Sequence, residues 1–307
     1  MGKTAFMFPG QGAQCIGMGK DFYEQIPVSR RMFEIASEAT GLDLPALCFE
    51  ENENIHITEY TQIALLTASV AMLEALKEKG VKSDVNAGLS LGEYGALVAS
   101  GAIDYEDACR LVRKRGIYMQ EEVPAGEGAM SAVLGMEASA IEEILEKEGK
   151  AVEIANYNCP GQIVISGETK AVLEVGEVIK EAGAKRVVPL KVSGPFHSSL
   201  LKGAGDKLAK ELENVTLHEF SVPYVTNVTA EYVTDTKEIK DLLIRQVSSS
   251  VRWQQSVELM LKDGVDTFIE IGPGKTLSSF VKKIDRSATV YNIQTVEDMN
   301  ALLEVLK

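Results

Sequence analysis

Residues 85–96, VNAGLSLGEYGA, contain a G-x-S-x-G pattern centred on Ser90. Apolar residues precede the pattern, and residues 93–100, which can form a helix, follow it and end at Gly101. A strand, a sharp turn and a helix in this order are typical of a nucleophile elbow, which exposes a serine at the amino end of the helix. Free backbone N–H groups and the helix dipole favour negative charge there. The pattern therefore predicts Ser90 as a nucleophile; the alternative is an ordinary glycine-rich turn that contains a serine.

The composition limits the class of protein. The chain has 307 residues, 45% of them hydrophobic, which is enough for one large domain or two unequal ones. No apolar run reaches the roughly 18 residues that span a bilayer, and the amino terminus has no signal-peptide pattern, so we expect a cytoplasmic protein without a membrane segment. The four cysteines have no C-x-x-C spacing and there are only three histidines. This predicts reduced thiols and no metal site.

The chain alternates strands and helices, but the pattern changes after residue 128. Strands and helices are predicted there in the order β-α-β-β-α-β, at residues 130–136, 139–147, 152–156, 162–166, 170–182 and 185–190. This order is typical of a ferredoxin-like unit, and Ser139 and Glu142 have the spacing of a capping box for its first helix. We expect this small domain, residues 128–192, to be inserted into an α/β-hydrolase-like large domain with a parallel sheet, residues 1–127 and 193–307.

A base for the serine can be sought among the three histidines. A serine hydroxyl is a poor nucleophile at neutral pH and needs a base within hydrogen-bond reach. His56 lies in an acidic stretch before a helix, and His218 is expected on a surface strand or loop. His197 lies in a glycine- and proline-containing loop downstream of Ser90, which is the order found in α/β elbow enzymes. His197 is therefore the candidate base; the alternative is a structural or solvated loop histidine.

Further motifs follow one another along the chain. They are Pro9-Gly10-Gln11-Gly12, Gly88-Leu89-Ser90-Leu91-Gly92-Glu93, Arg115-Gly116 with Met119-Gln120, Asn156 with Pro160-Gly161-Gln162, Gly194-Pro195-Phe196-His197, Gln246, and Glu270-Ile271-Gly272-Pro273-Gly274. In these motifs the chain resembles the malonyl-CoA:acyl carrier protein transacylases of bacterial fatty acid synthesis, and the related acyltransferase domains of polyketide synthases. The resemblance covers essentially all 307 residues.

The resemblance implies roles for the reacting groups. Ser90 would be the acylated nucleophile and His197 its base. A backbone carbonyl near Gln246 would take the place of the acid of a catalytic triad and orient His197. Gln11, together with the backbone N–H of Leu91, would form the oxyanion hole.

The resemblance also implies how the substrate is bound. Arg115 would hold the free carboxylate of the malonyl group by a two-pronged contact, since a planar guanidinium matches a carboxylate and keeps its charge. Asn156, Phe196 and Gln246 are further expected substrate contacts, and the bulk of Phe196 would crowd an α-methyl group. One position departs from the pattern, because the family usually has histidine before the serine where this chain has Leu89. We expect Leu89 to pack under the turn.

The activity implied by the resemblance is ping-pong acyl transfer. Ser90 would take a malonyl group from malonyl-CoA and pass it to the phosphopantetheine thiol of acyl carrier protein, with no cofactor of its own. One alternative is transfer of another acyl group from CoA in polyketide synthesis. Another is a serine esterase or thioesterase, which would have no use for Arg115 in its pocket. A third is a non-catalytic module that binds the carrier protein.

The charge of the chain bears on its partners. The formal net charge of −14 argues against nucleic acid, and it promotes solubility. The same charge disfavours an acidic carrier protein unless basic residues gather locally. The candidate docking residues are Lys185, Arg186, Lys282, Lys283 and Arg286. We expect a monomer.

Overall fold

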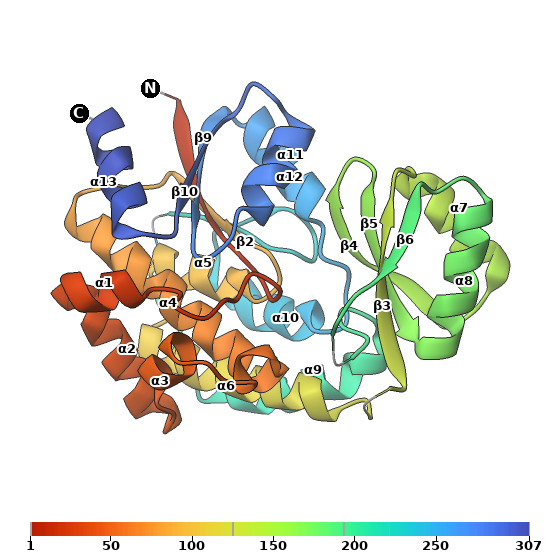
Figure 1. Ribbon diagram of the computed structural model, residues 1–307, viewed down its shortest axis with the longest axis horizontal. Coiled ribbons are helices and arrows are strands. Elements are labelled where there is room, and N and C mark those ends of the chain that lie inside the picture. Colours follow the sequence, from red (N-terminus) through yellow and green to blue (C-terminus); the bar gives the residue numbers. More distant parts are fainter. Residues whose placement is uncertain (1, 125, 193, 221, 307) are drawn as a thin grey trace.

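Two β-sheets organise the molecule, one mostly parallel and one antiparallel (Figure 1). The computed structural model describes residues 2–124, 126–192, 194–220 and 222–306. The larger sheet has the strand order β10-β9-β1-β2-β7-β8. The strands are β1 (Lys3–Phe8), β2 (Val85–Gly88), β7 (Tyr224–Val225), β8 (Tyr232–Val233), β9 (Val265–Ile271) and β10 (Thr289–Ile293). All neighbours are parallel except β7 and β8, so the predicted parallel sheet is present and has one antiparallel edge strand.

Helices cover both faces of the larger sheet. They are α1 (Lys20–Gln25), α2 (Pro27–Thr40), α3 (Leu44–Phe49), α4 (Thr58–Glu78), α5 (Gly92–Ser100), α6 (Tyr105–Glu121), α9 (Lys202–Glu213), α10 (Thr236–Gln246), α11 (Trp253–Lys262), α12 (Thr276–Ile284) and α13 (Val296–Val305), with short 3-10 helices at Asn54–His56 and Ser199–Leu201. Residues of α4 and α5 belong to one hydrophobic cluster, and residues of α11 and α12 belong to another. The sheet therefore lies between two helical layers.

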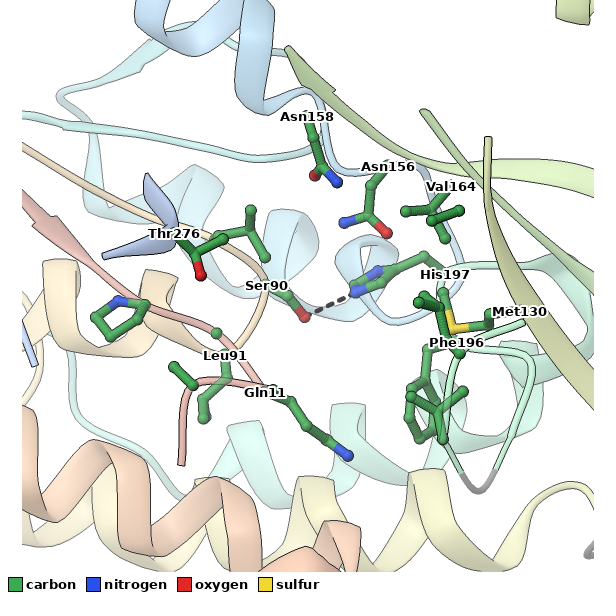
Figure 2. A pocket seen from close by; sticks show the side chains of 18 of the residues that line it. Gln11, Ser90, Leu91, Met130, Asn156, Asn158, Val164, Phe196, His197 and Thr276 are labelled. Carbon is green, nitrogen blue, oxygen red and sulfur yellow. Dashed lines mark hydrogen bonds between the residues drawn. The ribbon is translucent and has the colours of Figure 1, made fainter. Parts of the chain in front are cut away.

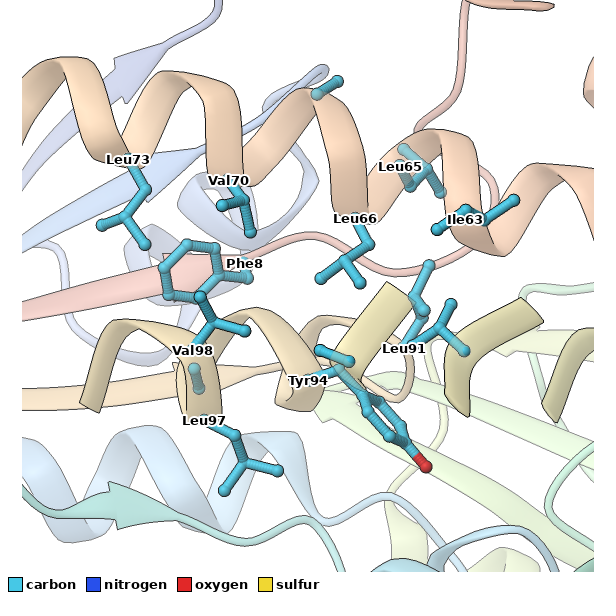
Figure 3. Packing of buried hydrophobic residues seen from close by; sticks show 14 of the residues in the cluster. Phe8, Ile63, Leu65, Leu66, Val70, Leu73, Leu91, Tyr94, Leu97 and Val98 are labelled. Atoms are coloured by element: carbon cyan, nitrogen blue, oxygen red, sulfur yellow. The ribbon is translucent and has the colours of Figure 1, made fainter. Parts of the chain in front are cut away.

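Strand β1 shows why the sheet is buried on both faces. Successive side chains of a strand point to opposite faces. Phe8 belongs to the cluster with α4 and α5, whereas Ala5 and Met7 belong to the cluster with α11 and α12. Figure 3 shows Phe8 between Val70 of α4 and Val98 of α5. A continuous apolar strand thus becomes a central strand that is buried on both faces and leads into the glycine-rich loop at residues 9–12.

The second sheet is antiparallel and has the order β4-β5-β3-β6. Its elements are β3 (Gly128–Leu134), α7 (Ala138–Glu148), β4 (Val152–Cys159), β5 (Gln162–Glu168), α8 (Thr169–Glu181) and β6 (Arg186–Pro189), in the predicted β-α-β-β-α-β order. Helices α7 and α8 pack on one face of this sheet, in a separate hydrophobic cluster. The opposite face is turned toward the larger sheet (Figure 1).

One local prediction is wrong. Helix α7 begins at Ala138 with Glu137 as its N-cap, and no side-chain cap forms, so Ser139 and Glu142 make no capping box. Glu142 instead accepts a hydrogen bond of 2.7 Å from the Tyr157 hydroxyl of β4. Glu142 therefore binds a side chain of the strand β4 and does not cap its own helix.

Strand β4 also joins the small sheet to the chain before α11. The backbone N–H of Val251 donates to the Ala155 carbonyl at 2.7 Å, and that of Tyr157 donates to the Val251 carbonyl at 2.9 Å. Residue 193, where the second segment of the large domain was expected to begin, lies outside the described residues, as do residues 1 and 307. Across the ranges that are described, no helix is long and apolar enough to cross a membrane.

Candidate active site

The elbow predicted at Ser90 is formed by β2, a turn and α5. Ser90 has φ = 54°, in the left-handed region that costs a residue with a side chain about 1–2 kcal/mol. The turn is so tight that a Cβ on Gly88 would lie 1.9 Å from the carbonyl carbon of Gly92. A Cβ on Gly92 would lie 2.0 Å from the backbone oxygen of Phe8 in the adjacent strand β1. Both flanking positions therefore require glycine.

Asn227, in the loop after β7, holds this strained turn. Its side-chain oxygen accepts a hydrogen bond of 2.6 Å from the backbone N–H of Ser90, and its Nδ2 donates to the Gly88 carbonyl at 2.7 Å. The sequence analysis did not find Asn227. A usable signal was present, because a polar residue directly follows a strand that pairs with β2, and the carboxyl ends of parallel strands meet at one edge.

His197 is placed to act on the Ser90 hydroxyl. Its Nε2 lies 2.7 Å from Ser90 Oγ (Figure 2). Its Nδ1 lies 2.9 Å from the backbone oxygen of Gln246. A carbonyl oxygen only accepts hydrogen bonds, so Nδ1 carries the hydrogen and Nε2 is left to accept the serine proton. The other two histidines lie elsewhere: His56 is exposed and ends a 3-10 helix, and His218 pairs with Asp104 at the surface.

The environment keeps His197 neutral. Burial and, to a smaller extent, the nearby Arg115 cation lower the pKa of His197 to about 4, against the opposing effect of the Gln246 and Ser249 carbonyls. At neutral pH the imidazole is therefore unprotonated and its Nε2 lone pair is available to a proton.

Arg115 reaches Ser90 from behind the turn. Its side chain is 1% exposed; Nη1 donates to Gln62 Oε1 at 2.7 Å, and Nη2 donates to Ser90 Oγ at 3.2 Å and Gln246 Oε1 at 3.0 Å. Its guanidinium also lies 5.6 Å from the centre of the Tyr94 ring. Nε has no partner among the residues described. A buried cation thus sits directly beside the serine oxygen, with donor capacity to spare.

A buried carboxyl group completes this polar layer. Glu93, in the first turn of α5, is fully buried, and its Oε2 accepts from Gln246 Nε2 at 2.6 Å and from the Asn227 backbone N–H at 3.1 Å. Burial raises the pKa of Glu93 to about 7, opposed by these hydrogen bonds and by Arg115. Sequence reasoning assigned Glu93 no role, although it belongs to the elbow motif.

The loop after β1 lies beside the elbow because Phe8 pairs with Gly88 in the sheet. The Gln11 side chain donates from Nε2 to Thr58 Oγ1 at 3.1 Å, and its amide end points away from Ser90 (Figure 2). The backbone N–H groups of Gln11 and Leu91 form no hydrogen bond with any described residue. These two backbone groups, rather than the Gln11 side chain, are therefore the available donors beside Ser90.

The sequence and the fold were compared with those of known proteins. Residues 5–301 match the acyl transferase domain family. The malonyl CoA-acyl carrier protein transacylase of Bacillus subtilis is 49% identical over 311 residues, covering 100% of this chain and 98% of its own. The crystal structure of the transacylase of that name from Clostridium perfringens gives a TM-score of 0.96 at 46% identity, covering 99% and 97% of the two chains.

The chain belongs to the malonyl CoA-acyl carrier protein transacylase family. A further structure of the family, a type II PKS acyl-carrier protein in complex with its malonyl-transacylase, gives a TM-score of 0.96 at 40% identity and covers 99% of both chains. The likeness spans both sheets, so it includes the whole site.

The side chains of Ser90 and His197 open into a cavity of about 270 Å³. Ser90 and His197 lie between walls from different parts of the fold (Figure 2). The small sheet contributes Met130, Ala132, Asn156, Asn158 and Val164; α12 contributes Thr276, Leu277 and Phe280; and Gln11, Gln62, Leu89, Leu91, Met119 and Phe196 complete much of the lining. The predicted site residues Asn156 and Phe196 thus reach the cavity, whereas Gln246 and Arg115 lie behind it.

The position that departs from the family pattern has two contacts. Leu89 packs against the cluster that contains Ala5 and Met7, as expected for a side chain under the turn. It also lines the cavity, which was not expected. The elbow therefore presents an apolar surface to a ligand on that side of Ser90. The described residues include no group of three or more side chains suited to a metal ion.

Proposed function

We propose that this acyltransferase carries a malonyl group from malonyl-CoA to the phosphopantetheine thiol of acyl carrier protein through a malonyl ester on Ser90, in fatty acid biosynthesis. The family membership gives the reaction class. One observation carries the choice of acyl group: the Arg115 cation lies 3.2 Å from the oxygen that bears the acyl chain. A neutral acyl group gains nothing from that cation, whereas the free carboxylate of a malonyl group pairs with it.

In the first half-reaction the Ser90 hydroxyl gives its proton to His197 Nε2, and the oxygen attacks the thioester carbonyl. The backbone N–H groups of Gln11 and Leu91 stabilise the resulting oxyanion. The C–S bond breaks, the CoA sulfur takes the proton from His197, and CoA leaves as the thiol, so that the imidazole is neutral again. The Gln246 carbonyl keeps the imidazole oriented through its 2.9 Å hydrogen bond with Nδ1.

In the second half-reaction the carrier thiol gives its proton to His197 and attacks the ester carbonyl. The C–O bond to Ser90 breaks, and the serine oxygen recovers the proton from His197. Water must stay out of the site between the two steps, or the ester hydrolyses. The apolar walls formed by Leu89, Met130 and Val164 support this exclusion.

The malonyl carboxylate is held by Arg115. The guanidinium has five N–H groups, and no acceptor in the described part of the chain binds Nε, so the guanidinium has a donor left for a ligand. The hydrogen now donated to Ser90 Oγ becomes available once that oxygen is esterified. Asn156 and Phe196 contact the substrate from the cavity wall, and Phe196 disfavours an α-methyl branch.

An acyl carrier protein is the partner we propose, since a related malonyl-transacylase forms a complex with its own. Three candidate docking residues gather near the turn between β4 and β5. Lys283 Nζ donates to Gln162 Oε1 at 3.0 Å, and Gln162 lines the cavity. Arg186 of β6 pairs with Leu134 of β3, which pairs on its other side with Gln162, and Lys185 is its neighbour. This group would attract an acidic carrier toward the cavity.

The other two candidate docking residues, Lys282 and Arg286, differ in whether their side chains already bind other parts of the chain. Lys282 donates to the backbone oxygens of Ala288 at 2.5 Å and Arg286 at 3.3 Å, so its ammonium is occupied at the end of α12. The Arg286 side chain is exposed and stays a candidate.

Charge reversal at Arg186 should raise the KM for the carrier protein, and an unchanged KM would remove this surface from the proposal.

We also propose that the two sheets are two domains. The large one, residues 1–127 and 193–307, is α/β-hydrolase-like, and residues 128–192 are ferredoxin-like. The elbow after β2 supports the first, and the strand order β4-β5-β3-β6 supports the second. We expect a cytoplasmic monomer that needs no cofactor, because CoA and the carrier bring the thiols.

A transfer assay tests the function. Purified protein should move malonyl from malonyl-CoA to holo acyl carrier protein, and S90A should reduce this by at least about 10³-fold. S279A, on the exposed face of α12, is the matched control and should leave the rate unchanged. Release of free malonate without transfer, or fast cleavage of a nitrophenyl ester, would favour the esterase or thioesterase instead.

A further inference from the structure

The side-chain amide of Gln246 links three parts of the site. Its Oε1 accepts from Arg115 Nη2 at 3.0 Å, and its Nε2 donates to the Ser90 carbonyl at 3.0 Å and to Glu93 Oε2 at 2.6 Å. The residue is fully buried, so no solvent replaces these bonds. One amide thus touches the cation, the elbow and the carboxylate at the same time.

The three groups that contact this amide leave it only one orientation. Arg115 can only donate hydrogen bonds, the Ser90 carbonyl can only accept them, and Glu93 Oε2 accepts from Gln246 Nε2 and from the Asn227 backbone N–H. If the Gln246 amide turned over, its NH₂ would face the guanidinium and its oxygen would face two acceptors. Hydrogen bonds lost to buried groups of this kind are costly, so Glu93 fixes the orientation together with the Ser90 carbonyl and Arg115, and its bond of 2.6 Å is the shortest of the three.

Glu93 is itself held from two directions. It lies in the first turn of α5, three residues after Ser90, and Oε2 accepts the Asn227 backbone N–H at 3.1 Å as well as the amide of Gln246. Asn227 in turn binds the Ser90 backbone N–H at 2.6 Å. The position of the carboxylate is therefore tied to the position of the nucleophile.

We propose that Glu93 is a positioning residue that sets selectivity for a carboxylate-bearing acyl group, acting through Gln246 on the orientation of the Arg115 guanidinium. This inference rests on the proposed function, because it assumes that Arg115 receives the malonyl carboxylate. With the amide fixed, the guanidinium presents Nη2 to Ser90 Oγ, where the acyl group is attached. Without Glu93, Gln246 turns more freely and the guanidinium loses that alignment.

Glu270 provides an internal contrast. It is also a fully buried glutamate with a pKa raised by burial, but its oxygens accept the backbone N–H groups of Leu277 and Ser278 at the start of α12 and the amide of Asn292. Glu270 therefore caps a helix and makes none of the contacts to Gln246 or Arg115. It serves as the matched control for removal of a buried carboxylate.

The experiment compares kcat/KM for malonyl-CoA and acetyl-CoA in wild type, E93L, E93Q and E270Q, with carrier protein as acceptor. E93L removes the carboxyl oxygens that can accept from Gln246 and Asn227. It should lower the ratio of kcat/KM for malonyl-CoA to that for acetyl-CoA by at least about tenfold. In E93Q the new side-chain oxygen can accept from both Gln246 and Asn227, so the ratio should stay within about threefold of wild type. E270Q should lower the melting temperature while leaving the ratio unchanged.

Equal losses for both acyl groups in E93L would overturn the proposal, because they would indicate a purely structural role. Loss of the ratio in E93Q would also overturn it, since the acceptor is retained there. Should E93L fail to fold, Q246L tests the same link while keeping the backbone carbonyl for His197, and an unchanged ratio contradicts the proposal. A wild-type protein without malonyl preference would instead refute the proposed function itself.

Discussion

The two sheets meet at one cavity but supply it with different kinds of residue. The parallel sheet contributes through loops at the carboxyl ends of its strands: Gln11 after β1 and Ser90 after β2 line the cavity, and Asn227 after β7 holds the Ser90 turn from behind. The antiparallel sheet contributes side chains from the faces of its strands, such as Met130 and Val164. Loops can adopt backbone angles that strands cannot, so they can aim a hydroxyl or an N–H group. The strand faces shape the cavity, and their apolar side chains help to keep water out of it. We therefore expect substitutions in these loops to change rates, and substitutions on these strand faces to change the shape of the cavity.

The largest effect is expected from removing the cation beside the elbow. R115A should lower malonyl transfer by about 10²–10³-fold, since a buried charge contact is worth roughly 2–5 kcal/mol. Acetyl transfer should fall much less, because an acetyl group has no carboxylate. Parallel kcat/KM measurements with the two CoA esters check this. The same loss for both would mean that Arg115 acts only on Ser90 or on the fold.

Loss of the Asn227 side chain should come next. N227A leaves the buried Ser90 N–H and Gly88 carbonyl without partners, and this should lower kcat by about 10–100-fold through a misplaced nucleophile. Because the acyl-binding groups are untouched, malonyl and acetyl transfer should fall together. A higher KM with an unchanged kcat would show that the loop after β7 shapes the cavity rather than the elbow.

The pH profile tests the neutral His197 directly. Its pKa is lowered to about 4, so kcat/KM should stay constant at neutral pH and fall only as the pH approaches 4. Removing Arg115 removes a cause of that lowering, so the acid limb of R115A should move to higher pH. The lowered pKa of His197 also affects the free energy of unfolding. As the pH falls from 6.5 to 4, the unfolded chain takes up a proton that folded His197 does not, so stability that is present above pH 6.5 should be lost over this range. An acid limb in R115A at or below the wild-type position would contradict the electrostatic coupling.

A smaller effect is expected from the wall of the cavity. F196A enlarges the space around the acyl group and should raise methylmalonyl transfer relative to malonyl transfer by about three- to tenfold. The rate with malonyl-CoA should change less than in N227A. A large loss of kcat with no gain for methylmalonyl would place Phe196 with the loop that orients His197, its neighbour in sequence.

The smallest effect concerns backbone strain in the loops of the parallel sheet. Ala230, which closes the loop that carries Asn227, has φ = 56°. A230G relieves the left-handed conformation but gains freedom in the unfolded chain, so we expect a net stabilisation of about 0.5 kcal/mol and unchanged kcat. Thermal unfolding and the transfer assay check both. A destabilised A230G would show that the loop is held by the Ala230 side chain.

Local pattern was enough to predict part of this site. The glycines of the elbow, the helix after it and the loop histidine all carry signals within a few residues. The Gln246 carbonyl was implied only by family resemblance, since any residue has a carbonyl and no side chain marks the one that binds His197.

The contacts that fix the site could not be read in this way. Asn227 and Gln246 reach the elbow from 137 to 156 residues away, and only the folded sheet brings them together. The same reason explains Gln11, whose side chain binds Thr58 on α4, and the failed capping box, where Tyr157 of the neighbouring strand binds Glu142.

The most direct test of the account is the intact mass of the protein after mixing with malonyl-CoA, followed by peptide mapping. The account predicts a malonyl-sized increase on the peptide that contains Ser90, which disappears when holo acyl carrier protein is added. Transfer to the carrier without any adduct on Ser90, or an adduct on another residue, would contradict it.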